Sequence, residues 1–260
     1  MGSGSRTIKR AVEILRAVSK LQNRGAGLAR VAKEAGLPFS TTHRIITGLV
    51  EGGLVHQNPQ NKKYFLSIEF FNLGAASQQF NVKDRLSVAL DRICHRTEDT
   101  VYLMVKSGNE ALCLDRLVGK FPIRAETLDV GGRRPLGIGT GSLALLAFLP
   151  DAQTEIIINA NKLFYPSCKN LSADDIRGLV KKASKTGFVL SEELFFEGIT
   201  ALAFPIYAPN EGLIAAISVA AISKRLKKDR QKEVAKIITS EIEAIGFAVC
   251  RNDENKNCGN

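Results

Sequence analysis

Short hydroxyl side chains and an arginine lie close together in the segment "PFSTTHRIITGLV". If the segment is helical, one side of it carries a group of donors, with a histidine at the border: Ser40, Thr41, Arg44, Thr47 and His43. No acidic residue interrupts that side. Hydroxyl and guanidinium groups can donate hydrogen bonds to phosphate oxygens and to base edges in the major groove of DNA. The group therefore indicates a helix that contacts DNA. A solvated surface is the alternative, and for His43 simple packing is equally open.

Three glycines alternate in the segment "PLGIGTGSLALLAFL": Gly137, Gly139 and Gly141. The segment lacks both the Gly-Lys-Ser/Thr ending of a nucleotide-binding loop and the third glycine of a dinucleotide fingerprint. A glycine turn nevertheless exposes backbone N–H groups at a helix N-terminus, where a carboxylate or another small anion is stabilised. Two interpretations stay open: an anion site, or glycines that only allow close packing.

A cysteine nucleophile is the third chemistry to consider, with either Cys94 beside His95 or Cys113. Neighbouring residues on a helix point about 100° apart, so Cys94 and His95 cannot easily share a hydrogen bond. No histidine follows His95 in the sequence. We therefore expect that the protein is not an enzyme.

The donor group needs a scaffold, and the N-terminal sequence predicts three helices. Residues 7–20 form the first, with Thr7 as its cap. Its apolar residues share one side: Ile8, Ala11, Val12, Leu15 and Val18. Residues 28–35 form the second, which Gly36 can end in a left-handed conformation, and Pro38 can open the third. The apolar side of the third helix is expected at Phe39, Thr42, Ile46, Leu49 and Val50.

Two short strands, residues 54–56 and 63–66, follow around a polar turn that contains Asn58 and Pro59. Three helices and a basic hairpin make a winged helix-turn-helix, whose third helix would enter the major groove. We predict DNA contacts from these residues: Ser40, Thr41, Thr42, His43, Arg44, Thr47, Lys62 and Lys63. Arg44 is the candidate for a bidentate contact to guanine or phosphate. For the two lysines a solvated turn remains the alternative.

The distribution of charge supports a nucleic-acid partner. The net charge is +10, and residues 1–66 hold 11 Lys/Arg against 3 Asp/Glu, a balance of +8. Residues 67–260 hold 25 against 23, a balance of +2. A basic head fused to a nearly neutral body is typical of a nucleic-acid-binding module joined to a second domain. A basic surface that serves only solubility is the alternative.

The cysteine and histidine content bears on compartment and metals. Five cysteines, without a CxxC pair, argue against a disulfide framework and a structural zinc site, and for a reducing cytoplasm. Three histidines without metal-site spacing make a metal unexpected, and we expect no cofactor. No apolar run reaches the roughly 18 residues of a membrane span, and the N-terminus lacks the apolar stretch of a secretion signal.

The rest of the chain mixes helices with strands. Helices are predicted over 84–99, 142–149, 175–187 and 224–250, and strands over 100–108, 110–118, 199–209 and 213–222. This order fits an α+β sensor sheet better than a doubly wound nucleotide fold. Residues 68–80 predict an amphipathic helix, and the polar residues 251–260 a mobile tail.

An ordered series of blocks resembles the IclR family of bacterial transcriptional regulators: "RAVEILRAV…GLARVAKEAGLPFSTTHRIITGLVEGGLV…YFLS", "IRAETLDVGGRRPLGIGTGSLALLAFLP", "GFVLSEELFFEGITALAFPIY" and "GLIAAISVAAISKRL". The likeness covers nearly the whole chain. It implies an N-terminal winged helix-turn-helix domain at 6–67, a linker helix at 68–82 and a C-terminal GAF-like effector-binding α/β domain at 83–250. It also implies dimers or dimers of dimers that bind operator DNA and a small metabolite, often an organic acid. The linker helix would pair two DNA-binding heads, or else pack on its own domain.

The same resemblance implies an effector site at the glycine turn and on nearby strands: Leu136, Gly139, Thr140, Gly141, Ser191, Ala201, Ser218 and Ala220. Members that bind small hydrophilic acids usually carry Asp, Cys and Ser where this chain has Ser191, Ala201 and Ala220. They also carry Gly-Lys where this chain has Ser142-Leu143. Fewer polar partners in the site leave fewer groups unpaired by an apolar ligand. We therefore expect a carboxylate with a larger apolar or aromatic body, whose head group Ser218 could bond.

The sequence thus predicts a ligand-responsive DNA-binding regulator, such as a repressor, of genes for small-molecule metabolism, in particular of organic or aromatic acids. Its partners would be double-stranded operator DNA, the effector and further copies of the chain, with no membrane. The alternative is a DNA-binding architectural protein whose second domain only dimerises. Only the regulator should be stabilised by a small ligand.

Overall fold

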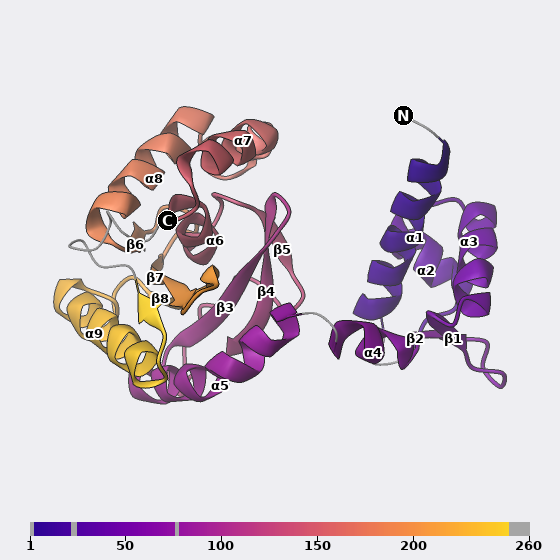
Figure 1. The fold of residues 1–260 in the computed structure, drawn as a ribbon, viewed down its shortest axis with the longest axis horizontal. Helices are drawn as coiled ribbons and strands as arrows, with labels where there is room; N and C mark the ends of the chain where they lie inside the picture. The colour runs from indigo at the N-terminus through magenta and orange to yellow at the C-terminus, as the bar shows by residue number, and fades with distance from the viewer. Residues whose placement is uncertain (1–2, 22–24, 76–77, 250–260) are drawn as a thin grey trace. The chain divides into compact units, whose positions relative to one another are not determined.

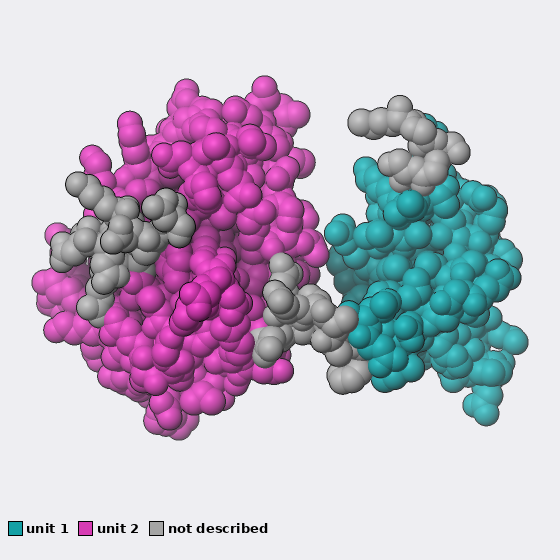
Figure 2. All heavy atoms as spheres, in the orientation of Figure 1, with its two compact units in different colours: residues 1–80 teal, residues 81–260 magenta. Residues whose placement is uncertain are grey.

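The computed structural model describes residues 3–21, 25–75 and 78–249. The chain divides into two compact units, residues 1–80 and 81–260 (Figure 2). The division between the units falls inside the segment that the sequence indicated as a linker, 68–82.

The first unit holds helices and one hairpin (Figure 1). In chain order its described elements are α1 (Ser3–Lys20), α2 (Leu28–Ala35), α3 (Phe39–Glu51), β1 (Val55–Gln57), β2 (Tyr64–Leu66) and α4 (Glu69–Ala75). The first three helices enclose an apolar core that includes Ile14, Val31 and Ile46, all fully buried. Val55 and Tyr64 of the hairpin pack against the same core. The predicted winged helix-turn-helix is confirmed.

The turn between α2 and α3 follows from two residues that the sequence singled out. Gly36 has φ 65° and ψ 29°, the left-handed conformation, and its N–H bonds the Lys33 carbonyl at 3.2 Å. The N–H of Leu37 bonds the Ala32 carbonyl at 3.1 Å. These bonds satisfy the last carbonyls of α2 and end the helix at the predicted residue. Pro38, in an extended conformation, then precedes the first residue of α3.

The first helix differs from its prediction in its start and in part of its buried side, because Val18, Ala11 and Leu15 pack on the core as predicted but Ile8 and Val12 do not. Helix α1 begins at Ser3, so Thr7 lies within it and is not its cap. Ile8 is 68% exposed and Val12 is 39% exposed, whereas Ile14 is fully buried. At about 100° per residue, Ile8 and Val12 lie roughly 120–160° around the helix from Ile14. The apolar residues of α1 therefore form two stripes, of which only the one with Ile14 packs into the core.

The hairpin is a short antiparallel pair, with Val55 opposite Leu66, and each strand starts one residue later than predicted. Asn58 organises its turn. The side-chain oxygen of Asn58 accepts hydrogen bonds from the N–H groups of Gln60 and Asn61 at 2.9 and 3.3 Å. An Asn that satisfies nearby backbone donors in this way fixes the turn without a longer strand pairing.

The second unit is built on an antiparallel sheet in the order β5-β4-β3-β8-β7-β6, with β9 paired to β7. Its strands are β3 (Thr100–Ser107), β4 (Glu110–Leu117), β5 (Arg133–Pro135), β6 (Val189–Glu192), β7 (Ile199–Ala208), β8 (Gly212–Ile222) and β9 (Ala248–Val249). Its helices are α5 (Gln78–Thr97), α6 (Thr140–Ala147), α7 (Asp151–Asn161), α8 (Ala173–Thr186) and α9 (Lys228–Ala244), with a short 3-10 helix at Tyr165–Ser167.

Helices α5 and α9 cover one face of the sheet, and α6, α7 and α8 lie on the other (Figure 1). Because both faces are covered, the central strands are apolar on both. On β3, Val101 and Leu103 pack in the layer of α5 and α9, while Tyr102 and Met104 pack in the layer of α6. This alternation decides which strand residues can reach a site beside α6.

The predicted hairpin of β3 and β4 is confirmed, with Gly108 at φ 64° in its turn, and the predicted α+β fold class is confirmed with it. The last helix is shorter than predicted. Gly246, at φ 80°, lies just beyond the end of α9, and Ala248–Val249 form β9 in place of a further helical turn. Strands β5 and β6 and helix α7 were not predicted.

The helix predicted over 68–80 is also divided differently. Helix α4 ends at Ala75, and α5 begins at Gln78, well before its predicted start at 84. The predicted tail, residues 251–260, lies outside the described residues.

Candidate functional site

The outward side of α3 carries most of the predicted donors. Ser40, His43, Arg44 and Thr47 are exposed and follow the spacing of one helical face, while Thr41 is half-buried. The Thr47 hydroxyl donates to the His43 carbonyl at 2.9 Å, within the helix. No acidic residue precedes Glu51 in this helix. The face can therefore offer donors to an anionic surface without an internal counter-charge.

Two residues of α3 were assigned to the wrong side. Thr42 is fully buried, and its hydroxyl donates to the Pro38 carbonyl at 3.0 Å, so the prediction that Thr42 contacts DNA is wrong. Phe39, expected to face inward, is 58% exposed, and Ile45 is buried in the core instead. A threonine can bury its methyl group while its hydroxyl bonds a helix carbonyl, so the residue type alone did not decide its side.

Of the two wing lysines, Lys62 is exposed and Lys63 is half-buried. Lys62 has φ 56°, a left-handed conformation that side chains other than glycine seldom adopt. The carbonyl of Lys62 accepts a hydrogen bond from the Gln57 side chain at 3.2 Å, which helps to hold it. The turn therefore presents the Lys62 side chain from a fixed backbone.

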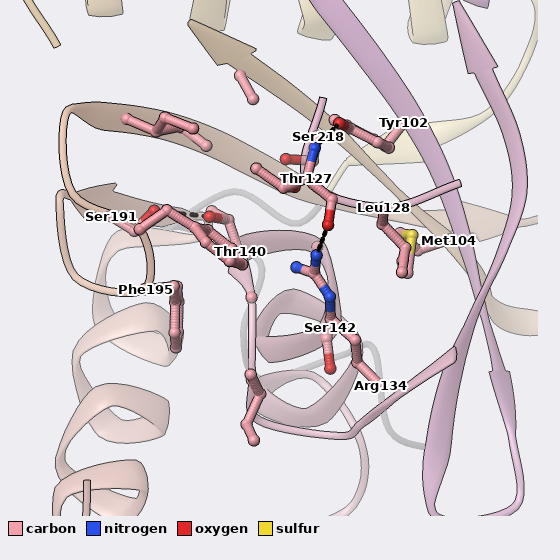
Figure 3. A pocket seen from close by; sticks show the side chains of 17 residues that line it. Tyr102, Met104, Thr127, Leu128, Arg134, Thr140, Ser142, Ser191, Phe195 and Ser218 are labelled. Carbon is pink, nitrogen blue, oxygen red and sulfur yellow. Dashed lines mark hydrogen bonds between the residues drawn. The ribbon is translucent and has the colours of Figure 1, made fainter. Parts of the chain in front are cut away.

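The second unit contains a cavity between the sheet and the N-terminus of α6 (Figure 3). Its walls come from β3, β5, β6, β7, β8, the start of α6, and the loops before β5 and before β7. The lining residues are Tyr102, Met104, Thr127, Leu128, Arg134, Ile138, Gly139, Thr140, Gly141, Ser142, Ser191, Phe195, Phe196, Ile199, Ala201, Ser218 and Ala220. The cavity volume is about 40 Å³. That volume holds about three water molecules, whereas a cavity that admits benzene measures about 150 Å³.

Seven of the eight residues predicted for the effector site line this cavity. Register explains why three of them meet: Ser191 lies opposite Ala201, and Ala201 opposite Ala220, in one row across β6, β7 and β8. The Ser191 and Thr140 hydroxyls share a hydrogen bond of 2.6 Å. Leu136 does not line the cavity and is fully buried.

Two hydrogen bonds to the Leu136 carbonyl explain why Leu136 is buried away from the cavity. The carbonyl accepts hydrogen bonds from the Tyr165 hydroxyl at 3.0 Å and from the Asn161 side chain at 3.3 Å. Leu136 thus anchors the turn to α7 and to the segment that follows it, and the prediction of a ligand contact from its side chain is wrong.

The geometry of the glycine turn supports close packing directly and is compatible with the anion site that the sequence left open. Gly139 has φ 90° and directly precedes α6, and a Cβ on Gly141 would lie 2.9 Å from Cγ of Met104. Close packing of α6 on the sheet therefore requires a glycine there. Gly139 and Gly141 also line the cavity, and within the described part of the chain α6 has no side-chain cap hydrogen bond at its N-cap residue, Gly139. The first N–H groups of the helix are thus placed where a small anion could accept from them.

Arg134 also lines the cavity, although the sequence reasoning did not select it. Its Nη2 donates to the Thr127 carbonyl oxygen, and its guanidinium carbon lies 4.7 Å from the centre of the Phe196 ring. Burial lowers the pKa of the Arg134 guanidinium. The signal that could have found it is the pair "RR" directly before the glycine turn, since one of two neighbouring strand residues must face the cavity.

The cysteines considered as nucleophiles lack the required surroundings. Burial, with smaller contributions from Asp91 and Asp99, raises the pKa of the Cys94 thiol. Burial raises the pKa of Cys113 to about 11. A thiol is reactive as its thiolate, so both shifts lower reactivity. Among the described residues no group of three or more His, Cys, Asp or Glu side chains could hold a metal ion, and no helix is long and apolar enough to cross a membrane.

Comparison with known proteins gives a consistent result. The family model described as "Bacterial transcriptional regulator IclR C-terminal" matches residues 74–246, and "IclR helix-turn-helix domain" matches residues 7–59. The chain is similar to the HTH-type transcriptional repressor AllR of Escherichia coli (strain K12), with 25% identity over 95% of this chain and 91% of that protein. It is also similar to the HTH-type transcriptional regulator KipR of Bacillus subtilis (strain 168), with 22% identity over 78% of this chain and 81% of that protein.

Solved structures show the same fold. A putative IclR transcriptional regulator from Silicibacter sp. TM1040 superimposes with a TM-score of 0.72 and 20% identity, covering 94% of this chain and 97% of that one. An IclR homologue from Microbacterium hydrocarbonoxydans, complexed with 4-hydroxybenzoate, gives a TM-score of 0.70 and 21% identity, covering 92% and 99%.

Proposed function

The chain belongs to the IclR family of bacterial transcriptional regulators, and we propose that its DNA affinity changes when a small organic acid binds in the cavity of the second unit. It is a transcriptional regulator with a helix-turn-helix domain and an effector domain, in a family that is not enzymatic. We infer further that it acts in the cytoplasm, in agreement with the three cysteines of the described residues, Cys94, Cys113 and Cys168, which are unpaired.

The outward face of α3 is the observation that carries the DNA-binding part of the proposal. Ser40, Arg44 and Thr47 are exposed along one side, and Arg44 can donate two parallel hydrogen bonds to guanine or to a phosphate. Lys62, at the tip of the hairpin, would contact the backbone and fix the position of α3 in the groove.

The test compares an exposed and a buried residue of α3, using a duplex enriched from random sequence by the wild-type protein. Arg44→Ala should weaken binding by about 1–3 kcal/mol, or roughly 5- to 150-fold. Thr42→Val is the matched control and should leave affinity unchanged, because the Thr42 hydroxyl bonds Pro38 inside the domain. Equal effects of the two changes would remove Arg44 from the interface.

Two further measurements address the same interface. Replacing Lys62 and Lys63 by Ala should reduce the dependence of binding on salt by about one unit for each lost phosphate contact. If the wild-type protein enriches no sequence over random duplex, with or without candidate acids, the proposed function fails.

The cavity supports an effector that is an organic acid. It combines apolar walls, such as Met104 and Phe195, with the uncapped N-terminus of α6. Ala201 and Ala220 add little polarity to the sheet side. The homologue bound to 4-hydroxybenzoate suggests an aromatic acid. A ring of that size requires more than the cavity volume of about 40 Å³, so side chains such as Phe195 would have to move.

The coupling between the effector and DNA need only be modest. An effector that changes DNA affinity 5- to 150-fold supplies about 1–3 kcal/mol. Thermal denaturation with a panel of organic acids separates this regulator from an architectural protein, because a domain that only dimerises should be stabilised by none of them.

We infer that the protein works as a homodimer or a dimer of dimers. Large apolar side chains are exposed on the first unit, including Ile8 at 68%, Ile68 at 76% and Leu73 at 55%. A second copy that covered them would remove this apolar surface from water. Light scattering on the wild type and on Ile68→Glu tests this inference, which fails if the wild-type protein is a monomer at micromolar concentration.

A further inference from the structure

Arg134 enters the cavity from the edge strand β5 and reaches toward Thr127 (Figure 3). The Thr127 carbonyl accepts from its Nη2, and the Phe196 ring lies against the guanidinium at 4.7 Å. The preceding residue, Arg133, does not line the cavity and instead pairs with Glu110 at 3.3 Å. Two adjacent arginines thus have different environments, one with an acidic partner and one inside the ligand cavity.

The Arg134 guanidinium has no carboxylate beside it within the described part of the chain. The ionisable groups that act on it are Tyr102, Cys168 and Cys113, and none of them is a carboxylic acid. Another partly buried arginine nearby, Arg116, pairs with Glu126 at 3.1 Å. A guanidinium stays protonated near neutral pH, so Arg134 brings a positive charge that no neighbouring carboxylate compensates. Neutralising such a charge is favourable wherever water is partly excluded.

The guanidinium also lies beside the N-terminus of α6. A Cβ built on Gly139 would stand 3.0 Å from Nη1 of Arg134, so the absence of a side chain at Gly139 leaves the space that this nitrogen uses. The N-terminal end of a helix carries a partial positive charge. An arginine and a helix N-terminus are therefore brought together at one part of the cavity wall.

We propose that Arg134 recognises the acid group of the ligand, an inference that rests on the proposed role of the cavity as the effector site. Thr127 takes one of the five N–H donors of the guanidinium, and a carboxylate can accept two others side by side. The Phe196 ring and the Thr127 carbonyl hold the guanidinium in position, so little freedom is lost when the acid binds. A neutral amide of the same shape has only one acceptor oxygen and no charge. The site therefore selects acids over their amides.

The experiment measures binding to the full-length protein by calorimetry in a buffer of low chloride concentration. The probes are three acids and their amides: pyruvate and pyruvamide, benzoate and benzamide, and 4-hydroxybenzoate and 4-hydroxybenzamide. At least one acid should bind the wild-type protein, with an affinity about ten-fold or more above that of its amide. Arg134→Met should weaken the binding of that acid by about ten-fold or more. Arg134→Lys should weaken it by less, because lysine keeps the charge but not the paired donors.

Arg133→Met is the matched control, and it should bind the acid within about two-fold of the wild type. Circular dichroism of each variant shows whether it folds, and Arg134→Gln replaces Arg134→Met if the latter does not. Equal acid affinity in the wild type and the Arg134 variant would overturn the inference while leaving the cavity as an effector site. Failure of all three acids to bind the wild type would overturn it as well. Neither result concerns operator binding, which is measured separately and tests the DNA-binding part of the proposed function.

Discussion

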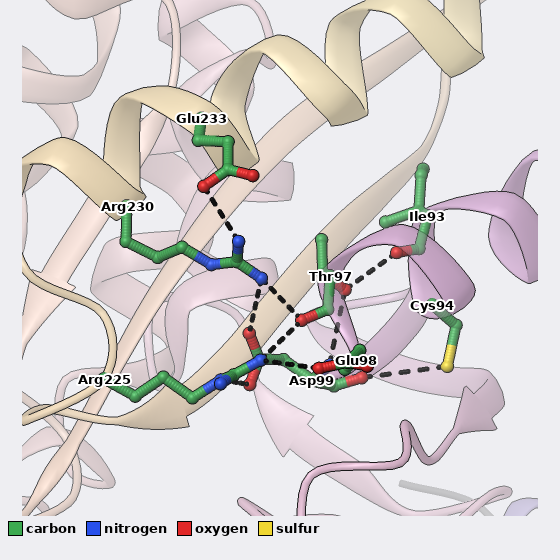
Figure 4. A network of polar contacts seen from close by, with 8 residues as sticks. All are labelled: Ile93, Cys94, Thr97, Glu98, Asp99, Arg225, Arg230 and Glu233. Carbon is green, nitrogen blue, oxygen red and sulfur yellow. Dashed lines mark hydrogen bonds and ion pairs between the residues drawn. The ribbon is translucent and has the colours of Figure 1, made fainter.

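Removing the Asp99 carboxylate would take a buried hydrogen-bond acceptor from Arg225 and a buried counter-charge from Arg230 (Figure 4). Asp99 lies two residues after the end of α5, and its side chain is 2% exposed. Its Oδ1 accepts from Nε of Arg225 at 2.7 Å, and its Oδ2 lies 3.9 Å from Nη2 of Arg230. Both arginines also donate to the Thr97 carbonyl, at 3.0 and 2.7 Å. The carboxylate therefore joins the end of α5, the segment after β8 and the first turn of α9.

The size of the effect follows from burial. Deleting one partner of a buried ion pair costs about 3–5 kcal/mol. Here the arginine side chains remain 21% and 24% exposed and keep the Thr97 carbonyl as an acceptor. We therefore expect Asp99→Ala to lower the free energy of unfolding by about 2–3 kcal/mol. For a unit of this size that corresponds to a decrease in Tm of about 4–12 °C.

The pKa of Asp99 indicates that burying its carboxylate is unfavourable. Burial raises it from its ordinary value, and this outweighs the opposing effect of the Arg225 hydrogen bond. The charged group is thus not favoured by its surroundings as a whole, although the arginines depend on it. Replacing Asp99, Arg225 and Arg230 together by apolar residues can leave the free energy of unfolding unchanged, whereas removing one of them lowers it.

Tyrosine fluorescence in urea is a suitable assay, because the chain has no tryptophan and three of its four tyrosines belong to the second unit. Asp129→Ala is the matched control. Asp129 also pairs with an arginine, Arg116, but its side chain is 88% exposed, so the loss should stay below about 1 kcal/mol. If Asp99→Ala were no more destabilising than Asp129→Ala, the argument from buried charge would be refuted.

Two further predictions concern the second unit. Ser172→Ala removes the capping box of α8 and should cost about 1 kcal/mol, measured by urea denaturation near neutral pH. Hydrogen bonds from Ser172 lower the pKa of Asp175. The stability that Asp175 contributes is therefore present above its ordinary pKa and is lost as pH falls through the lower pKa of the folded state. Ser172→Ala should reduce this loss of stability in acid, and an unchanged dependence of stability on pH would contradict the assignment. Gly141→Val places a Cβ 2.9 Å from Cγ of Met104 and 3.4 Å from Cβ of Ser218, with two methyl groups beyond it, and should lower stability by about 1–3 kcal/mol in thermal denaturation. A Tm equal to that of the wild type would show that α6 can move away from the sheet.

The sequence predicted the elements whose signals are local. Gly36 and Pro38 define the helix-turn-helix because one residue needs the left-handed conformation and the other cannot continue a helix. Gly108 defines the β3–β4 turn in the same way. Gly246 gave an equally local signal at the end of α9, and the prediction overlooked it.

The errors lie where position depends on distant residues. Strand β5 has three residues, and only its pairing with β4, where Arg134 lies opposite Ala111, determines that Arg134 reaches the cavity. Strand β9 has two residues, and it exists because β7 offers an edge. A threonine such as Thr42 can face either the solvent or the core, and the packing of the domain core determines that it faces inward. Side-chain direction is thus a property of the assembled fold at these sites.

The sheet offers a direct route from the cavity to α5. Met104 lines the cavity, while Leu103, its neighbour on β3, packs on the other face with Leu90 of α5. Because packed interiors transmit displacement rather than absorb it, a ligand that moves β3 must also move residues of that second layer. Helix α5 starts at Gln78, within the segment that leads from the DNA-binding unit. A ligand can change DNA affinity only if it binds two arrangements of this layer unequally. If the proposed acid effector acts through this layer, substitutions at Leu103 should alter its effect on DNA binding more than they alter acid binding itself.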